Sequence, residues 1–75
     1  MTRDDFMVAL AELLERPTGS FSGSDTLESL DWDSIRVIEF ISIVDEKLQG
    51  EVLPDAISEC VTIDDLVALV SDKLD

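Results

Sequence analysis

The chain of 75 residues contains no histidine and a single cysteine, Cys60. One cysteine cannot close an internal disulfide, and it cannot build a metal site alone. Without histidine, no imidazole is available to activate a serine or thiol, and the sequence places no other base beside a nucleophile. We therefore predict neither a metal site nor an enzyme, and we interpret Cys60 as a small buried apolar residue.

Long hydrophobic runs are also missing. The apolar stretches are too short to cross a bilayer, and residues 1–5 lack the apolar core of a signal peptide. These absences predict no membrane insertion and a cytoplasmic location. Apolar residues nevertheless make up 45% of the chain, more than a disordered acidic segment contains. We expect one compact helical domain over residues 1–75, and a monomer by default.

Positive charge is scarce, because five basic residues stand against eighteen acidic ones and the net charge is −13. Such a surface repels nucleic acid and anionic membranes, so neither is predicted as a partner. It attracts proteins with basic patches and speeds their encounter. Acidity alone would equally suit a small protein that only needs to stay in solution, so the placement of the acids decides between these interpretations.

Apolar residues recur at helical spacing and predict four helices, with no alternating pattern typical of strands. Thr2 and Asp5 can form a weak capping box at the start of the first helix. Arg16 suits its last turn, and Pro17 ends it. The glycine- and serine-rich segment that follows extends to the second helix, and loops this long are usually functional or mobile. We expect Leu27 and Leu30 to pin this long loop to the core.

The remaining helices follow local signals. The second helix is predicted over residues 34–48, with Gly50 as its stop. Pro54 opens a short third helix in the first turn, where its missing N–H costs nothing, and Cys60 limits its length. Thr62 opens the fourth helix, whose apolar side holds Ile63, Leu66, Val67, Val70 and Leu74. The predicted fold is an all-α four-helix bundle with three longer helices, one short third helix and a long first loop.

The second helix has two patterned faces. At 100° per residue, its core face holds Val37, Phe40, Ile41, Val44 and Leu48. The opposite face sets two isoleucines among carboxylates, and its members are Ile35, Ile38, Glu39, Ser42, Asp45 and Glu46. Apolar residues within an acidic patch suit the docking of a basic partner protein. The alternative is that Ile35 or Ile38 packs under the long loop. Arg36, three residues before Glu39, is expected to pair with it.

Ser34 stands at the head of this helix, directly after Asp33. A serine there has an exposed hydroxyl, and the positive end of the helix would stabilise a phosphate esterified to it. We interpret Ser34 as a point where another protein attaches a group. The alternative is a helix cap, because Asp and Ser are common capping residues.

These residues resemble the acyl carrier proteins, whose signature is Asp-Ser-Leu at the head of the second helix. Here the motif is Asp33-Ser34-Ile35, and Pro54-Asp55 and Thr62-Ile63-Asp64-Asp65 are also similar. The resemblance implies that Ser34 carries 4′-phosphopantetheine, transferred from coenzyme A by a phosphopantetheinyl transferase. The thiol of this arm would hold acyl intermediates as thioesters. It further implies partner recognition by Glu39, Asp45 and Glu46, and a cargo cleft between the second and third helices lined by Phe40, Ile57, Val61 and Ile63, which also fit plain core.

Three positions depart from the family pattern. Ile35 replaces a leucine, Arg36 stands where an acid is frequent, and Trp32 precedes the Asp-Ser pair. Trp32 either packs inward under the loop or stands beside the arm. The expected function is an acyl carrier for fatty-acid, polyketide or specialised lipid synthesis. The alternatives are an aminoacyl or peptidyl carrier, and a non-carrier acidic helical module for protein interaction.

Overall fold

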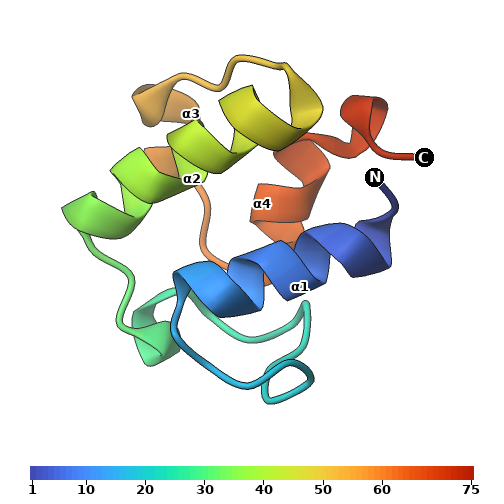
Figure 1. Ribbon diagram of the computed structural model, residues 1–75. Helices are drawn as coiled ribbons and strands as arrows, with labels where there is room; N and C mark the ends of the chain where they lie inside the picture. Colours follow the sequence, from blue (N-terminus) through green and yellow to red (C-terminus); the bar gives the residue numbers. More distant parts are fainter.

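The structure is a computed structural model that describes residues 1–75. It contains four α-helices and no strand, only one isolated β-bridge between Thr26 and Thr62, which confirms the predicted all-α fold (Figure 1). The helices are α1 (Arg3–Leu13), α2 (Ser34–Leu48), α3 (Pro54–Ser58) and α4 (Ile63–Leu69), and two short 3₁₀ turns are η1 (Glu28–Leu30) and η2 (Ser71–Lys73).

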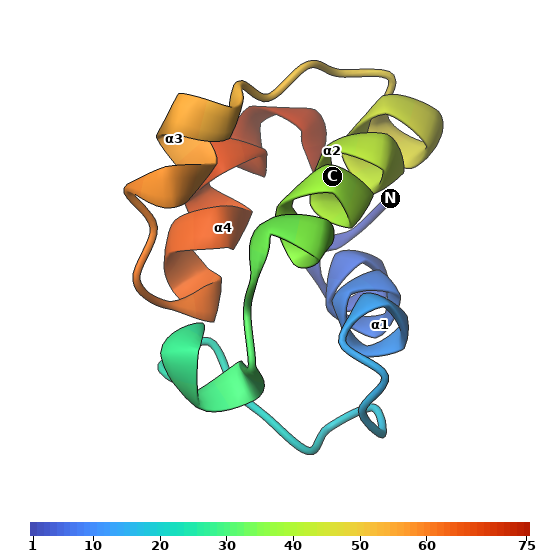
Figure 2. The same ribbon diagram turned by 90° about the vertical axis from the view of Figure 1, so that its left-hand side faces the viewer.

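The longest helix, α2, contacts α1 and α3, and α3 in turn contacts α4. The long loop between α1 and α2, which includes η1, crosses one end of this arrangement (Figure 2). The chain termini meet elsewhere, where the amino group of Met1 lies 3.0 Å from the carboxylate of Asp75. None of the helices has the length and apolar character needed to span a bilayer.

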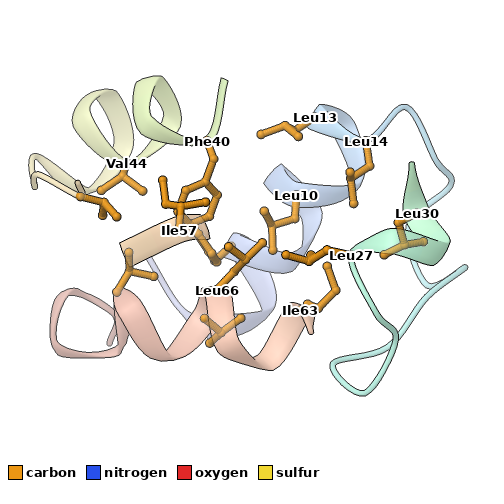
Figure 3. Packing of buried hydrophobic residues seen from close by; sticks show 14 residues of the cluster. Leu10, Leu13, Leu14, Leu27, Leu30, Phe40, Val44, Ile57, Ile63 and Leu66 are labelled. Carbon is orange, nitrogen blue, oxygen red and sulfur yellow. The ribbon is translucent and has the colours of Figure 1, made fainter. Parts of the chain in front are cut away.

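The core collects apolar side chains from all four helices and from the long loop (Figure 3). At its centre the rings of Phe6 and Phe40 meet edge to face, with centroids 5.9 Å apart, a favourable aromatic geometry. Phe40 and Val44 are fully buried, as the pattern of α2 predicts. Leu27 and Leu30 are buried too, so the long loop is pinned to the core as expected.

Both predicted threonine starts form complete capping boxes. At α1, the hydroxyl of Thr2 accepts the N–H of Asp5 at 3.1 Å, and the Asp5 carboxylate accepts the N–H of Thr2 at 3.3 Å. At α4, the hydroxyl of Thr62 accepts the N–H of Asp65 at 3.2 Å, and the Asp65 carboxylate accepts the N–H of Thr62 at 3.0 Å. Each box satisfies backbone donors that the first turn leaves without helical partners.

The predicted end of α1 is wrong, because the helix stops at Leu13 and does not reach Arg16. Glu15 adopts a left-handed conformation (φ 57°), and the N–H of Arg16 returns to the carbonyl of Ala11 at 3.0 Å. This is a Schellman ending, which usually places glycine in the left-handed position. The Arg16 side chain instead pairs with Asp31 of the long loop, at 3.3 Å.

Gly50 is likewise not the residue that turns the chain out of α2. Gln49 takes the left-handed conformation (φ 50°), and its N–H returns to the carbonyl of Val44. A Cβ at position 50 would overlap the far end of the Lys73 side chain, and a larger residue there would require that flexible side chain to move.

The apolar pattern of the fourth helix extends further than the helix itself. The helix ends at Leu69 and η2 follows, so Leu74 lies beyond regular structure and is half-buried. The other four predicted core residues of this segment, which are Ile63, Leu66, Val67 and Val70, are buried.

Candidate functional site

The start of α2 is capped by Asp33. This residue has extended backbone angles, and its carboxylate accepts the N–H of Arg36 at 3.0 Å. Ser34 is therefore the first helical residue, not the cap. Its side chain is exposed and forms no hydrogen bond within the chain. The capping role belongs to Asp33, and the hydroxyl of Ser34 is left free.

The first turn of α2 contains no acidic side chain, whereas α1 and α4 each place two aspartates there. The partial positive charge of this helix end is consequently less compensated than at the other two. Arg36 lies in the same turn and pairs with Glu15 at 3.2 Å and with Glu39 at 3.1 Å. The hydrogen bond that Arg36 donates to Glu15 is the main cause that raises the pKa of Arg36. The predicted Arg36–Glu39 pair is confirmed, and the Glu15 contact was not predicted.

The outward face of α2 is apolar at one end and acidic at the other. Ile35 and Ile38 are 62% and 65% exposed, so the alternative that either packs under the long loop is wrong. Asp45 and Glu46 are exposed and form no ion pair within the chain, whereas Glu39 is half-buried beside Arg36. Two free carboxylates therefore share this face with two exposed isoleucines.

A surface groove of about 390 Å³ lies beside the start of α2. It runs between the long loop and the segment that joins α3 to α4, and its lining residues are Thr26, Leu27, Glu28, Trp32, Cys60 and Val61. The half-buried Trp32 packs inward, which is the first of its two predicted placements, with its ring centroid 6.1 Å from that of Phe40. The same side chain also lines the groove, which sequence reasoning did not predict.

Cys60 is only half-buried, so the prediction of a buried cysteine holds in part. Its thiol donates to the carbonyl of Ala56, with the sulfur and oxygen 3.5 Å apart. Burial raises the pKa of the Cys60 thiol, and the charges of Asp65 and Glu59 raise it further. The thiol is consequently a poor nucleophile at neutral pH.

Comparison with known proteins identifies the family. The family model described as the phosphopantetheine attachment site matches residues 4–70. The chain belongs to this family. No match was found among the curated proteins or among the solved structures.

As a member, the chain is a carrier of covalently attached 4′-phosphopantetheine and not an enzyme, which confirms the predicted cofactor. Carriers of this family interact with a phosphopantetheinyl transferase and with acyl-processing enzymes.

Four residues of the carrier were expected to line a cargo cleft. Phe40, Ile57 and Ile63 are at most 1% exposed and pack in the core, where they border neither of the two surface hollows. Val61 differs, because it is 61% exposed and lines the groove. The structure thus separates Val61 from the other three, and a lining role for any of them stays a prediction.

Proposed function

We propose that this carrier bears its arm on Ser34 and presents acyl groups as thioesters to enzymes of fatty-acid, polyketide or specialised lipid synthesis. The observation that supports this most strongly is the free hydroxyl at the start of α2. Because Asp33 satisfies the cap, the Ser34 oxygen is exposed and has no partner within the chain. A transferase can reach such an oxygen without breaking a native hydrogen bond.

The other serines fit the attachment role less well. Two of them, Ser20 and Ser42, also lack a side-chain hydrogen bond, but Ser20 lies in the long loop and Ser42 lies in the middle of α2. The remaining hydroxyls are engaged within the chain, and they belong to Ser22, Ser24, Ser29, Ser58 and Ser71. Ser34 alone combines a free hydroxyl with the N-terminus of a helix.

The surroundings of Ser34 suit a phosphodiester. The N–H groups of the first turn of α2 would face the added phosphate, and helix N-termini stabilise such anions. No side chain of that turn carries negative charge. The carboxylate of Asp33 accepts the N–H of Arg36 and is held there. When bound, the arm supplies the thiol that forms the thioester, and the role of this chain is to hold and present it.

The outward face of α2 suits partners with basic docking patches. Exposed Ile35 and Ile38 offer dry contact beside the attachment point, and Asp45 and Glu46 offer unpaired carboxylates further along. Such acids steer and orient a basic partner. Glu39 is already paired with Arg36, so we rank Asp45 and Glu46 above Glu39 in this role. The strong acidity and Asp33 favour an acyl carrier over an aminoacyl or peptidyl carrier.

The attachment site is tested by intact mass. The purified chain is incubated with coenzyme A, magnesium and a promiscuous phosphopantetheinyl transferase. We expect the wild type to gain the mass of one arm and Ser34→Ala to gain none. Ser42→Ala is the matched control, because it removes an equally unbonded hydroxyl from the same helix, and it should be modified like the wild type. Modification of Ser34→Ala would refute the proposed site.

The docking face is tested by charge reversal. Asp45→Lys combined with Glu46→Lys should slow turnover by a partner enzyme and leave the free energy of unfolding nearly unchanged. The control is Glu12→Lys with Glu51→Lys, which makes the same charge change at exposed acids outside α2. Equal slowing by both pairs would mean that overall charge, and not this face, governs docking.

The cargo is tested by loading the holo-protein with acyl-activating or amino-acid-activating enzymes. We expect stable thioesters from the first class. Loading by the second class alone would instead favour the aminoacyl alternative.

A further inference from the structure

Two ion pairs connect the end of α1 to the segment that carries Ser34. Glu15 and Arg16 are consecutive residues just beyond α1, where the long loop begins (Figure 2). Arg36, in the first turn of α2, donates to Glu15 at 3.2 Å, and Arg16 donates to Asp31 of the long loop at 3.3 Å. The pairs therefore hold the chain both before and after Ser34. We call these four residues the α1–α2 clamp.

The guanidinium of Arg36 is held at both of its terminal nitrogens. One donates to Glu15, and the other donates to Glu39 of the same helix at 3.1 Å. The Arg36 side chain is only 21% exposed. Because residues two apart on a helix point to different sides, this side chain is directed to α1 and not to the hydroxyl of Ser34. Arg36 therefore bridges the two helices without contacting the attachment point.

Both acidic members of the clamp have left-handed backbone conformations. The φ angle is 57° at Glu15 and 60° at Asp31, and Gln49 is the only other non-glycine residue with a positive φ. This conformation is strained for glutamate, whereas glycine adopts it freely. The Glu15 side chain is 79% exposed, and exposed ion pairs add little to stability. Stability alone consequently does not explain a glutamate at position 15.

The clamp also uses basic residues that are scarce in this chain. Arg16 and Arg36 are two of only five basic residues, and eighteen acidic residues offer them other partners. Arg16 moreover keeps its Nε buried without a hydrogen-bond partner, which is itself unfavourable. Both arginines nevertheless pair across the two ends of the same long loop, where that loop meets α1 and α2.

We propose that the clamp positions the start of α2 for transfer of the arm, with its four members as positioning residues. This inference rests on the proposed attachment of the arm at Ser34. In the transfer, the Ser34 oxygen bonds to the pantetheine-bearing phosphorus of coenzyme A, and the bond from that phosphorus to the second phosphate breaks. Adenosine 3′,5′-bisphosphate leaves, and the hydroxyl proton passes to a base of the transferase. Misplacing a reacting atom by about 1 Å can slow a step about a hundredfold.

The proposal is tested by the kinetics of arm transfer, measured by intact mass at saturating coenzyme A and varied concentrations of the chain. Glu15→Gln breaks one bridge and should lower kcat about threefold, as expected of a displacement well below 1 Å, with KM for the chain unchanged. The matched control is Glu12→Gln. It removes the same charge from an exposed α1 residue that pairs with none of the arginines, and it should keep the kcat of the wild type.

The second bridge has its own matched variants. Arg16→Gln removes the pair with Asp31 and should also lower kcat about threefold at unchanged KM. Arg3→Gln removes the pair with Asp64, which joins α1 to α4 at 2.9 Å. This control loses the same charge and one ion pair away from the clamp, and it should transfer the arm like the wild type.

Glu15→Gly separates positioning from stability. Glycine relieves the left-handed strain, so this variant should unfold at a urea concentration no lower than that of the wild type. It also lacks the carboxylate that binds Arg36, so its kcat should fall as in Glu15→Gln. A residue that only stabilised the fold would make stability and rate change in the same direction.

Contrary results have distinct meanings. Wild-type kcat in Glu15→Gln, Glu15→Gly or Arg16→Gln would overturn the proposal, and so would equal slowing in the two controls. A change confined to KM would make these residues a contact surface for the transferase, which also overturns positioning, as would a joint loss of stability and rate in Glu15→Gly. If the wild type gains no arm, or Ser34→Ala still gains one, the attachment site itself fails, and the clamp proposal fails with it.

Discussion

The helix starts of this carrier fall into two kinds. At α1 and α4, a threonine cap and an aspartate three residues later bind each other's backbone, so the hydroxyl is consumed and the first turn is acidic. At α2, the cap is Asp33, and the third helical residue is Arg36. The hydroxyl of Ser34, the residue after the cap, therefore forms no hydrogen bond within the chain.

The difference shows how a small domain separates stability from function. We call the starts of α1 and α4 closed, because both side chains of each capping box accept backbone N–H groups. These side chains have no other role in the account of function. We call the start of α2 open. One carboxylate, that of Asp33, caps this helix, and the hydroxyl of Ser34 stays free in the positive potential of the helix N-terminus. Because the fold makes no use of the Ser34 oxygen, its modification should not disturb folding.

The largest effect on stability is expected from breaking a closed start. Thr62→Ala removes the hydroxyl that accepts the N–H of Asp65, and loss of such a cap costs about 1–2 kcal/mol. Ser34→Ala, which removes a hydroxyl without a partner, should change the free energy of unfolding by less than about 0.5 kcal/mol. Urea unfolding measures both variants. Equal losses would contradict the distinction between the two kinds of start.

The next effect concerns the cap of the open start. Asp33→Ala leaves the N–H of Arg36 without its acceptor and should cost about 1 kcal/mol by the same measurement. Asp33→Asn retains an acceptor oxygen and should recover most of this loss. If the asparagine variant is as unstable as the alanine variant, capping by Asp33 does not stabilise α2.

A smaller effect is expected when the open start is made acidic. Arg36→Glu places a carboxylate in the first turn of α2, where it opposes the incoming phosphate, and helix-end charges of this kind are worth about 0.3–1 kcal/mol. We expect kcat/KM for transfer of the arm to fall about two- to fivefold. Lys47→Glu makes the same charge change at the other end of α2 and serves as the control. A similar fall in kcat/KM for Lys47→Glu would mean that the net charge of the chain, and not charge in the first turn of α2, causes the effect.

The smallest effect is the pH dependence of a closed start. The N–H groups of Val61 and Thr62 bind the carboxylate of Asp65 and lower its pKa. A lowered pKa stabilises the folded state above the ordinary carboxyl value, and this contribution is lost as the pH falls below about 4. The difference in stability between the wild type and Asp65→Asn should therefore narrow between pH 7 and pH 3. A difference that stays constant would contradict this role.

The local patterns of the sequence were sufficient to predict the helices that carry the site. The amphipathic period predicted for α2 the bounds that the structure has, Ser34–Leu48. The threonine starts of α1 and α4 were also recognised, because a capping box involves residues only three apart. The exposed position of Ile35 and Ile38 followed from the same periodicity.

The features that sequence reasoning missed depend on contacts between distant residues. Glu15 and Gln49 end helices in left-handed conformations for which glycine is the usual signal. The Glu15 side chain is held by Arg36, a contact that no local pattern indicates. The groove likewise depends on the bond from Leu27 to Val61, which joins segments far apart in the sequence. Trp32 was recognised as unusual, but its place in a groove required the fold.

The most direct test of this account is to locate the arm by fragment-ion mass spectrometry of the modified chain. Trypsin should release a peptide from Asp4 to Arg36, because Pro17 blocks cleavage after Arg16. We predict that the fragment ions of this peptide place the arm on Ser34 and leave Ser29 unmodified. An arm found on any other serine, or on the later peptide that contains Ser42, would contradict the claim that the free hydroxyl at the start of α2 is the attachment point.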